Sequence, residues 1–286
     1  MPTRVQSALD QTGALVFPGV YDTLSAKMAE RVGFELAFVS GYAVSATFIG
    51  EPDVGLLTQS EVIDRARRIC ASVAIPVIVD ADTGYGNPLN VARTVRELMA
   101  AGAAGCFLED QQWPKRCGHM RGKRVVSRDE YLGKIRAAVD TRGDADFFIV
   151  ARTDAIAVAG VDEAVARAVA ARDAGADATF IEAPRSREEL AEVGRRAPKP
   201  TVANMIEQGR TPVLPREELA ALGFQLILYP LTGLYASARA LETVYGRLRA
   251  EGASTADDRL IAFERFNELI GVDAKHALAE RYGEDS

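Results

Sequence analysis

The sequence of 286 residues lacks the features that mark several large protein classes. Positive charge is not in excess, because 34 Lys and Arg residues stand against 40 Asp and Glu residues, for a formal net charge of −6. A general nucleic-acid-binding protein normally carries a basic face, so we expect no nucleic-acid partner. No apolar run approaches the roughly 18 residues of a membrane-spanning helix, so we expect no membrane segment.

Cysteine is also scarce. The three cysteines, Cys70, Cys106 and Cys117, have no paired spacing, which argues against a disulfide framework. The first eleven residues lack the basic start, apolar stretch and small-residue cleavage site of a secretory signal. Together these features predict a cytoplasmic protein. Hydrophobic residues make up 48% of the chain, which is enough for a globular core.

One pattern recurs, in which a helix-like stretch ends in glycine and a short apolar run then ends at a polar residue. The examples are residues 32–40, 101–110, 174–182 and 222–229. The glycine suits a left-handed residue after a helix, and a non-alternating apolar run is typical of a strand buried on both faces. Further apolar runs without the glycine occupy residues 14–18, 75–82, 146–154 and 200–204.

Strands that alternate with helix-like segments predict parallel βα units. Eight units within roughly 250 residues favour a closed (β/α)8 barrel, the TIM barrel. The competing arrangement is an open doubly wound sheet, although no Gly-x-Gly-x-x-Gly turn follows the first strand. We therefore expect one α/β barrel domain over residues 1–286.

Extra helices are predicted at the C-terminal end, at residues 237–249, 257–270 and 273–282. Residues 251–286 form the expected helical extension. The apolar residues of this tail are more than a short terminal helix should leave in water. We expect them to pack on another subunit or on the barrel floor.

Polar and charged residues follow nearly every predicted strand. They are Ser40, Asp80, Asp82, Glu109, Asp110, Arg152, Asp154, Glu182, Asn204 and Tyr229. Working groups of barrels lie at the carboxyl ends of strands, so we expect these side chains to converge on one mouth. Several carboxylates there would repel one another unless a cation lay among them. Asp80, Asp82 and Glu109 offer oxygen ligands only, which suit Mg²⁺ or Mn²⁺ better than zinc.

Some of these acids have a simpler interpretation. For Asp110 and Asp154, a role as helix cap or turn residue is equally acceptable. For Asp80 and Asp82 the interpretation as cap or turn residues is weaker, because alternation along a strand would point both side chains to the same side.

A polar loop, residues 113–123, follows the strand that ends at Glu109. It contains a thiol (Cys117), an imidazole (His119) and several cations. Such a loop could close over an anionic substrate, and cationic neighbours would lower the pKa of the Cys117 thiol. The alternatives are a solvated basic loop and half of a zinc site, but the zinc site lacks a second ligand pair at suitable spacing.

A series of motifs carries a family resemblance. In chain order they are Ser40-Gly41-Tyr42, Gly50-x-Pro52-Asp53-x-Gly55, Asp80-x-Asp82-x-Gly84, Glu109-Asp110-Gln111, Lys115-Arg116-Cys117-Gly118-His119, Arg152-Thr153-Asp154, Glu182-Ala183-Pro184 and Asn204-Met205-Ile206-Glu207. Together they resemble the isocitrate lyase/phosphoenolpyruvate mutase superfamily. The stretches 16–22 and 109–123 resemble its branch of the petal death protein and the 2-alkylmalate (2,3-dimethylmalate) lyases.

The resemblance implies a role for each matching residue. It implies Mg²⁺, or Mn²⁺, bound directly by Asp80, with water molecules on the metal held by Asp53, Asp82 and Glu109. The implied substrate-binding residues are Tyr21, Ser40, Gly41, Tyr42, Asp53, Gly118 and Asn204. The implied catalytic residues are Cys117 as proton donor, with Lys115, His119, Arg152 and Glu182. A homotetramer (a dimer of dimers) with C-terminal helices exchanged between subunits is implied as well.

The implied activity is cleavage of a 2-hydroxy dicarboxylate, of the 2-alkylmalate or 2,3-dimethylmalate type, to a 2-oxo acid and a monocarboxylic acid by retro-aldol chemistry. The alternatives are hydrolysis of oxaloacetate to oxalate and acetate, methylisocitrate cleavage, phosphonate mutase or hydrolase chemistry, and a non-catalytic scaffold. Cys117 counts against the phosphonate branch. A Schiff-base aldolase is excluded, because no lysine is expected at a strand end.

Overall fold

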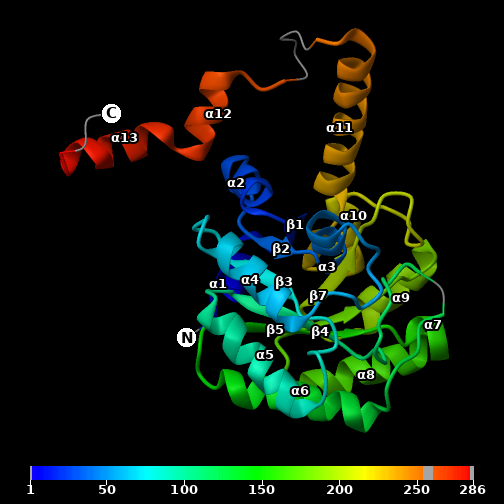
Figure 1. Ribbon diagram of the computed structural model, residues 1–286. Coiled ribbons are helices and arrows are strands. Elements are labelled where there is room, and N and C mark those ends of the chain that lie inside the picture. Colours follow the sequence, from blue (N-terminus) through cyan, green and yellow to red (C-terminus); the bar gives the residue numbers. More distant parts are fainter. Residues whose placement is uncertain (1, 121, 254–259, 284–286) are drawn as a thin grey trace. The chain divides into compact units, whose positions relative to one another are not determined.

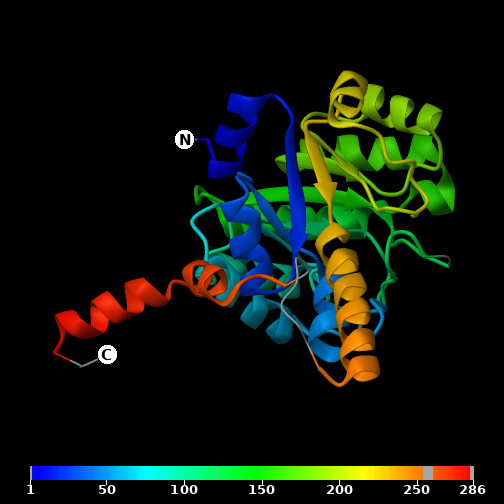
Figure 2. The same ribbon diagram turned by 90° about the horizontal axis from the view of Figure 1, so that it is seen from above.

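The computed structural model describes residues 2–120, 122–253 and 260–283. Within them, parallel strands form a closed barrel in sequence order, and the first strand pairs with the last (Figures 1 and 2). The strands are β1 (Leu15–Val20), β2 (Ala37–Val39), β3 (Val77–Asp80), β4 (Gly105–Glu109), β5 (Phe148–Thr153), β6 (Ala178–Ile181), β7 (Thr201–Asn204) and β8 (Leu226–Tyr229). The expected TIM barrel is confirmed, and the open sheet is excluded.

One helix precedes β1, and the other helices follow the strands and surround the barrel (Figures 1 and 2). They are α1 (Arg4–Thr12), α2 (Thr23–Arg31), α3 (Gly41–Val44), the π-helical turn η1 (Ser45–Ile49), α4 (Gln59–Cys70), α5 (Pro88–Ala100), α6 (Arg128–Arg142), α7 (Ile156–Ala159), α8 (Val161–Asp173), α9 (Arg187–Arg196) and α10 (Arg216–Leu222). Asn87 caps α5, where its side chain accepts hydrogen bonds from the N–H groups of Leu89 and Asn90.

Strand register brings charged side chains together at the carboxyl end of the barrel. The pairing of β4 with β5 runs from Gly105 beside Phe148 to Glu109 beside Arg152. Below this end, aromatic rings fill the barrel interior. The ring centroids of Phe38 and Phe107 lie 4.7 Å apart, and the Phe107 ring packs edge-on against Phe180. The mouth is therefore open only above this packed floor.

The chain divides into two compact units, residues 1–234 and 235–286. Helix α11 (Thr232–Glu251) starts in the first unit and continues into the second, which also contains α12 (Phe263–Ile270) and α13 (Val272–Arg281). The expected helix at 257–270 starts among residues outside the described part, and its described portion is helical only from Phe263. No helix in the described ranges is long and apolar enough to cross a membrane.

Candidate active site

A cavity of about 40 Å³ lies at the carboxyl end of the barrel. Many of the expected site residues line it: Ser40, Tyr42, Asp53, Asp80, Cys117, Gly118, His119, Arg152, Glu182 and Asn204. Its floor is formed by the aromatic rings below, and Ile206, Pro230 and Leu231 add an apolar wall. At roughly 10–15 Å³ for each water, this space holds only about three water molecules. A dicarboxylate can enter only if part of the wall moves.

The other expected residues do not line this cavity. They are Tyr21, Gly41, Asp82, Glu109 and Lys115, all of them buried. Tyr21 packs within the hydrophobic core. Gly41 lies against Asp80, since a Cβ built on it would be 3.0 Å from Asp80 Oδ2. The other three residues, Asp82, Glu109 and Lys115, contact side chains that line the cavity or lie beside it.

Lys115 joins two of the acids. Its ammonium group forms ion pairs with Asp53 and with Asp82 Oδ1, the latter at 2.7 Å without a well-directed hydrogen bond. Burial raises the pKa of Asp82 to about 7, despite the opposing effect of the nearby Lys115. Although burial opposes it, the surrounding carboxylates hold the pKa of Lys115 well above its usual value. Lys115 is therefore a charged lysine enclosed by acids.

Asp80 and Asp82 do not share a strand face, so the expectation based on strand alternation is wrong. Strand β3 ends at Asp80, and Asp82 follows in the left-handed region with φ of 48°. The N–H of Asp82 donates a hydrogen bond of 3.1 Å to Asp80 Oδ1. A turn, rather than an extended strand, places the two carboxyl groups, and only Asp80 lines the cavity.

Arg152 crosses the mouth between two carboxylates. Its Nη2 lies 3.3 Å from Glu109 Oε2, and its Nε donates a 2.9 Å hydrogen bond to Asp154 Oδ2. Burial raises the pKa of Glu109 well above its usual value, and its Oε1 has no hydrogen-bond partner among the described residues. The pKa of Asp154 is shifted the other way. Burial would raise it, but Arg152 and Lys123 lower it to about 2. Asp154 is thus an ion-pair partner rather than a simple turn residue.

Glu182 connects three elements around the cavity. Its Oε1 lies 3.0 Å from His119 Nε2, and Asn204 Nδ2 donates hydrogen bonds of 3.3 and 3.2 Å to its two oxygens. His119 Nδ1 accepts a hydrogen bond from the N–H of Arg210, so its proton is placed on Nε2, toward Glu182. Although burial opposes it, Arg152 and His119 hold the pKa of Glu182 below its usual value.

The loop after β4 is folded over the mouth. Gln111 anchors its start through hydrogen bonds with the backbone N–H and carbonyl of Arg116. Lys123 anchors its end, because its Nζ donates hydrogen bonds of 2.6 Å to both Asp154 Oδ1 and the carbonyl of Gly118. The sequence did not single out Gln111 or Lys123 as anchors, since nothing in the local pattern distinguishes them from other polar loop residues.

The thiol of Cys117 lines the cavity, but its expected pKa direction is wrong. Burial raises the pKa to about 11, and the hydrogen bond from the His119 backbone opposes this only in part. The cations expected to lower it are otherwise engaged, as Lys115 pairs with acids and Lys123 with Asp154. Cys117 is therefore a protonated thiol at neutral pH. The other cysteines, Cys70 and Cys106, lie on α4 and β4 as expected.

The acid cluster fits a divalent cation. Two cations, Lys115 and Arg152, lie among four carboxylates: those of Asp53, Asp80, Asp82 and Glu109. Arg152 also forms an ion pair with Asp154. The described residues contain no three His, Cys, Asp or Glu side chains already grouped as metal ligands. Mg²⁺ does not need such a cage, because it keeps several waters and takes one or two carboxylates. Two acids of this cluster, Asp53 and Asp80, line the cavity. Asp53 is paired with Lys115, so Asp80 is the carboxylate best placed to bind the cation.

Comparisons with known proteins show the family of the chain. Residues 6–248 match the family described as phosphoenolpyruvate phosphomutase. The chain is 51% identical to a chloroplastic carboxyvinyl-carboxyphosphonate phosphorylmutase of Arabidopsis thaliana, covering 98% of this chain and 84% of that protein. It is 43% identical to a 2,3-dimethylmalate lyase of Eubacterium barkeri, covering 98% and 97%.

Solved structures share the fold at lower sequence identity. An oxaloacetate acetylhydrolase in complex with 3,3-difluorooxalacetate superimposes with a TM-score of 0.92 at 38% identity, covering 99% of this chain and 97% of that one. A phosphonopyruvate hydrolase in complex with oxalate and Mg²⁺ superimposes with a TM-score of 0.88 at 33% identity, covering 98% of both. The chain therefore belongs to the phosphoenolpyruvate phosphomutase family, within the PEP mutase/isocitrate lyase superfamily.

Proposed function

We propose that this protein is a Mg²⁺-dependent carbon–carbon lyase that cleaves a 2-hydroxy dicarboxylate of the 2-alkylmalate type. One observation carries the proposal: a half-buried, protonated thiol, Cys117, lines the same small cavity as Asp80 and Arg152. The products would be a 2-oxo acid and a monocarboxylic acid. The 2,3-dimethylmalate lyase among the relatives supports this substrate class.

Cleavage of the C2–C3 bond leaves negative charge on the departing acid, and the residues of the cavity suit that charge. Arg152 supplies a guanidinium group at the cavity, and one preorganised donor contributes roughly 3 kcal/mol to transition-state stabilisation. Cys117, which remains a neutral thiol, holds a proton that it can give to the new carbanionic carbon. Mg²⁺, when bound, would acidify the substrate hydroxyl and stabilise the forming carbonyl.

The remaining residues orient the substrate. Ser40 and Tyr42 line the side of the cavity next to Asp80, where we assign the 2-oxo acid half. Asn204 and Glu182 line it with Arg152, where we assign the departing acid. The apolar wall of Ile206, Pro230 and Leu231 suits an alkyl substituent better than a charged one.

The proposal is tested by a coupled assay for pyruvate or glyoxylate with malate, methylmalates, dimethylmalate, 2-methylisocitrate and isocitrate. We expect release of a 2-oxo acid from a 2-alkylmalate, and its loss with EDTA. The matched variants are Cys117→Ala and Cys117→Ser. Full turnover by Cys117→Ala would show that Cys117 is not the proton donor and would overturn the mechanism.

Hydrolysis of oxaloacetate to oxalate and acetate is the second candidate. The similarity to the oxaloacetate acetylhydrolase structure favours it. Oxalate formed from oxaloacetate would identify this activity, whereas pyruvate formation would indicate decarboxylation. Because the Arabidopsis relative is a phosphorylmutase, phosphonopyruvate belongs in the same screen.

We also propose a homotetramer in which C-terminal helices mediate assembly. Large apolar side chains of the second unit are exposed within the single chain, among them Ile261, Phe263 and Ile270. Phe263 alone is 76% exposed. Apolar surface of this kind is typical of a protein interface.

A further inference from the structure

A second cavity lies on the outer side of the loop that covers the barrel mouth. It has a volume of about 650 Å³ and is lined by Met120, Gly122, Lys123, Ala157, Val158, Arg185 and Arg210. None of these residues lines the cavity that holds Cys117 and Asp80. The size is within the range of roughly 300–1,000 Å³ that is usual for small-molecule sites.

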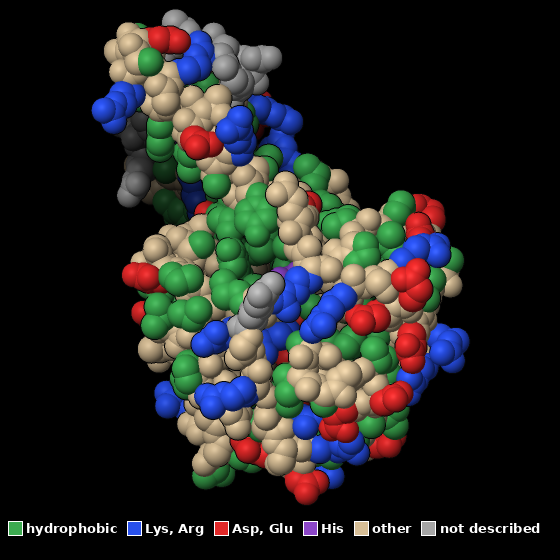
Figure 3. Space-filling model, turned by 90° about the vertical axis from the view of Figure 1, so that its right-hand side faces the viewer, with side chains coloured by type: hydrophobic (Ala, Val, Ile, Leu, Met, Phe, Trp, Pro, Cys, Tyr) green, Lys and Arg blue, Asp and Glu red, His purple; other side chains and the backbone are tan. Residues whose placement is uncertain are grey.

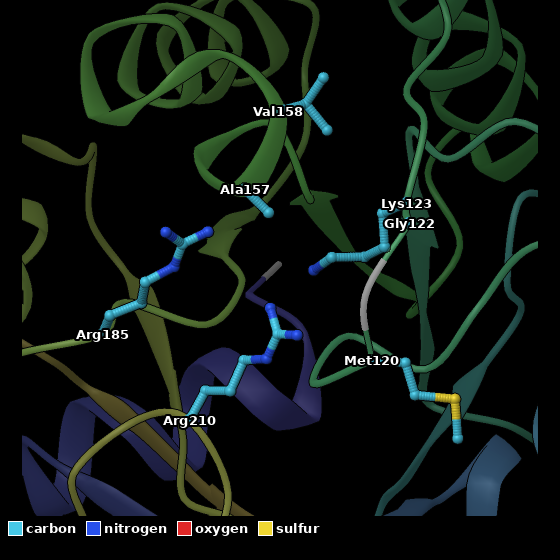
Figure 4. Close-up of a pocket in the computed structure, with 7 residues that line it drawn as sticks. All are labelled: Met120, Gly122, Lys123, Ala157, Val158, Arg185 and Arg210. Atoms are coloured by element: carbon cyan, nitrogen blue, oxygen red, sulfur yellow. The ribbon is translucent and has the colours of Figure 1, made fainter.

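Three cationic side chains point into this space from different elements. In Figure 4 the Lys123 ammonium group and the guanidinium groups of Arg185 and Arg210 converge on the centre of the cavity. Arg185 follows β6, and Arg210 follows β7. Figure 3 shows several Lys and Arg side chains close together near the middle of one face of the molecule.

The two guanidinium charges of the cavity are not balanced by its own walls, whereas Lys123 is paired with Asp154. Among the described residues, no Asp or Glu lines it, and neither guanidinium group has a hydrogen-bond or ion-pair partner. Lys123 donates to Asp154 and to the carbonyl of Gly118, and its third N–H has no further partner among them. Like charges brought together in this way repel one another unless an anion lies between them.

We propose that this cavity binds a compact oxyanion with at least two negative charges. Guanidinium groups pair with phosphate and carboxylate oxygens through two parallel hydrogen bonds, which makes Arg185 and Arg210 the main ligands. Ala157 and Val158 of α7 give the cavity an apolar side, which accommodates a short hydrocarbon part. A small phosphate-bearing or polycarboxylate metabolite has this chemistry.

Binding there acts on the loop that covers the active site. Lys123 fastens the loop through the carbonyl of Gly118, and residues 117–119 face the catalytic cavity from the other side of the same segment. An anion that bridges Lys123 to Arg185 and Arg210 would tie the loop to the residues after β6 and β7. The occupied site therefore favours the closed loop seen in this structure.

The test is titration calorimetry of the full chain with inorganic phosphate and, separately, with tricarballylate, both without Mg²⁺. We compare the wild type with Arg185→Gln/Arg210→Gln. The charge-matched control is Arg93→Gln/Arg195→Gln, which removes two surface arginines outside the cavity. Arg152→Gln reports on binding in the barrel mouth.

We expect one anion per chain, bound at least about tenfold more weakly by Arg185→Gln/Arg210→Gln and within about twofold of wild type by the other variants. If phosphate binds more tightly than tricarballylate, the site prefers a phosphate group; if tricarballylate binds more tightly, it prefers carboxylates. Absence of binding in both arms, or equal weakening by Arg152→Gln, would overturn the proposal. This result does not depend on the lyase activity, which Arg152→Gln tests separately.

A second measurement follows the loop. Hydrogen exchange of the amides of residues 117–120 should slow with phosphate in the wild type but not in Arg185→Gln/Arg210→Gln. Unchanged exchange in the wild type would contradict the coupling between the two cavities.

Discussion

Gly118 lies so close to Glu182 that a Cβ on Gly118 would be 2.5 Å from the carboxyl carbon and from Oε1 of Glu182. Glu182 itself is held by Asn204 and faces His119, so it cannot retreat without losing these contacts. Position 118 therefore admits only glycine while the loop covers the mouth.

The first prediction concerns this contact. Gly118→Ala should push the loop away from Glu182 and displace Cys117. Since a displacement of about 1 Å can reduce the rate about 10²-fold, we expect a loss of this order in kcat/KM with little change in Tm. The control is Gly133→Ala within α6, where the new Cβ meets only Pro88 at 3.8 Å. That variant should keep full activity and gain about 0.5–1 kcal/mol of stability. Wild-type kcat/KM in Gly118→Ala would disprove the close contact.

The second prediction concerns the protonation of Cys117. The difference in thiolate absorbance between wild type and Cys117→Ser should titrate with a midpoint of about 11. The folded-state pKa is raised, so the contribution of Cys117 to stability is fully present below its unfolded pKa of about 8.5 and is lost as the pH rises to about 11. We expect Cys117→Ala to lower kcat by about 10²–10⁴-fold. A midpoint near 8 would show an activated thiolate instead of a proton donor.

The third prediction concerns Lys115, which is enclosed by Asp53 and Asp82. Lys115→Met leaves two buried carboxylates without their cation and should cost about 3–5 kcal/mol in the free energy of unfolding. Added Mg²⁺ should recover part of this loss, because it restores positive charge to the acids.

Urea denaturation with and without Mg²⁺ measures both effects. The control is Arg93→Gln, which breaks an exposed pair with Glu97 at 4.0 Å and should change stability by less than about 1 kcal/mol. A Lys115→Met protein as stable as wild type would show that the acids are protonated and need no cation.

The fourth prediction concerns the metal. Mg²⁺ at 100 times its dissociation constant should stabilise the wild type by about 2.7 kcal/mol, seen as a rise in Tm. Asp80→Asn should abolish this rise, because it removes the cavity-lining carboxylate of the acid cluster that is not paired with Lys115. Asp64→Asn, an exposed acid on α4, is the control and should respond as wild type does. An equal rise in Asp80→Asn would place the metal elsewhere.

The fifth prediction concerns assembly. Light scattering after gel filtration should give the mass of a tetramer for the wild type. Phe263→Asp/Ile270→Asp should give a smaller species, because each change places a charge on exposed apolar surface of α12. Glu264→Gln on the same helix should leave the mass unchanged. A monomeric wild type would contradict the proposed tetramer.

The sequence by itself determined the barrel fold and the polar residues at the carboxyl ends of its strands. Each buried strand reads as an apolar run that ends in a polar residue, since both faces of a parallel strand are covered. The polar ends could be named before the structure, from Ser40 to Asn204. The motif order also identified the superfamily.

Only the tertiary structure decided how those residues interact. Lys115 and Lys123 belong to the same polar loop, but Lys115 is enclosed by acids at the mouth and Lys123 fastens the loop to Asp154. The pKa of Cys117 is raised rather than lowered, because burial outweighs neighbouring charges that are already paired. The cavity between Lys123, Arg185 and Arg210 joins residues far apart in the chain. Burial and charge pairing depend on contacts through space, and local sequence patterns do not encode them.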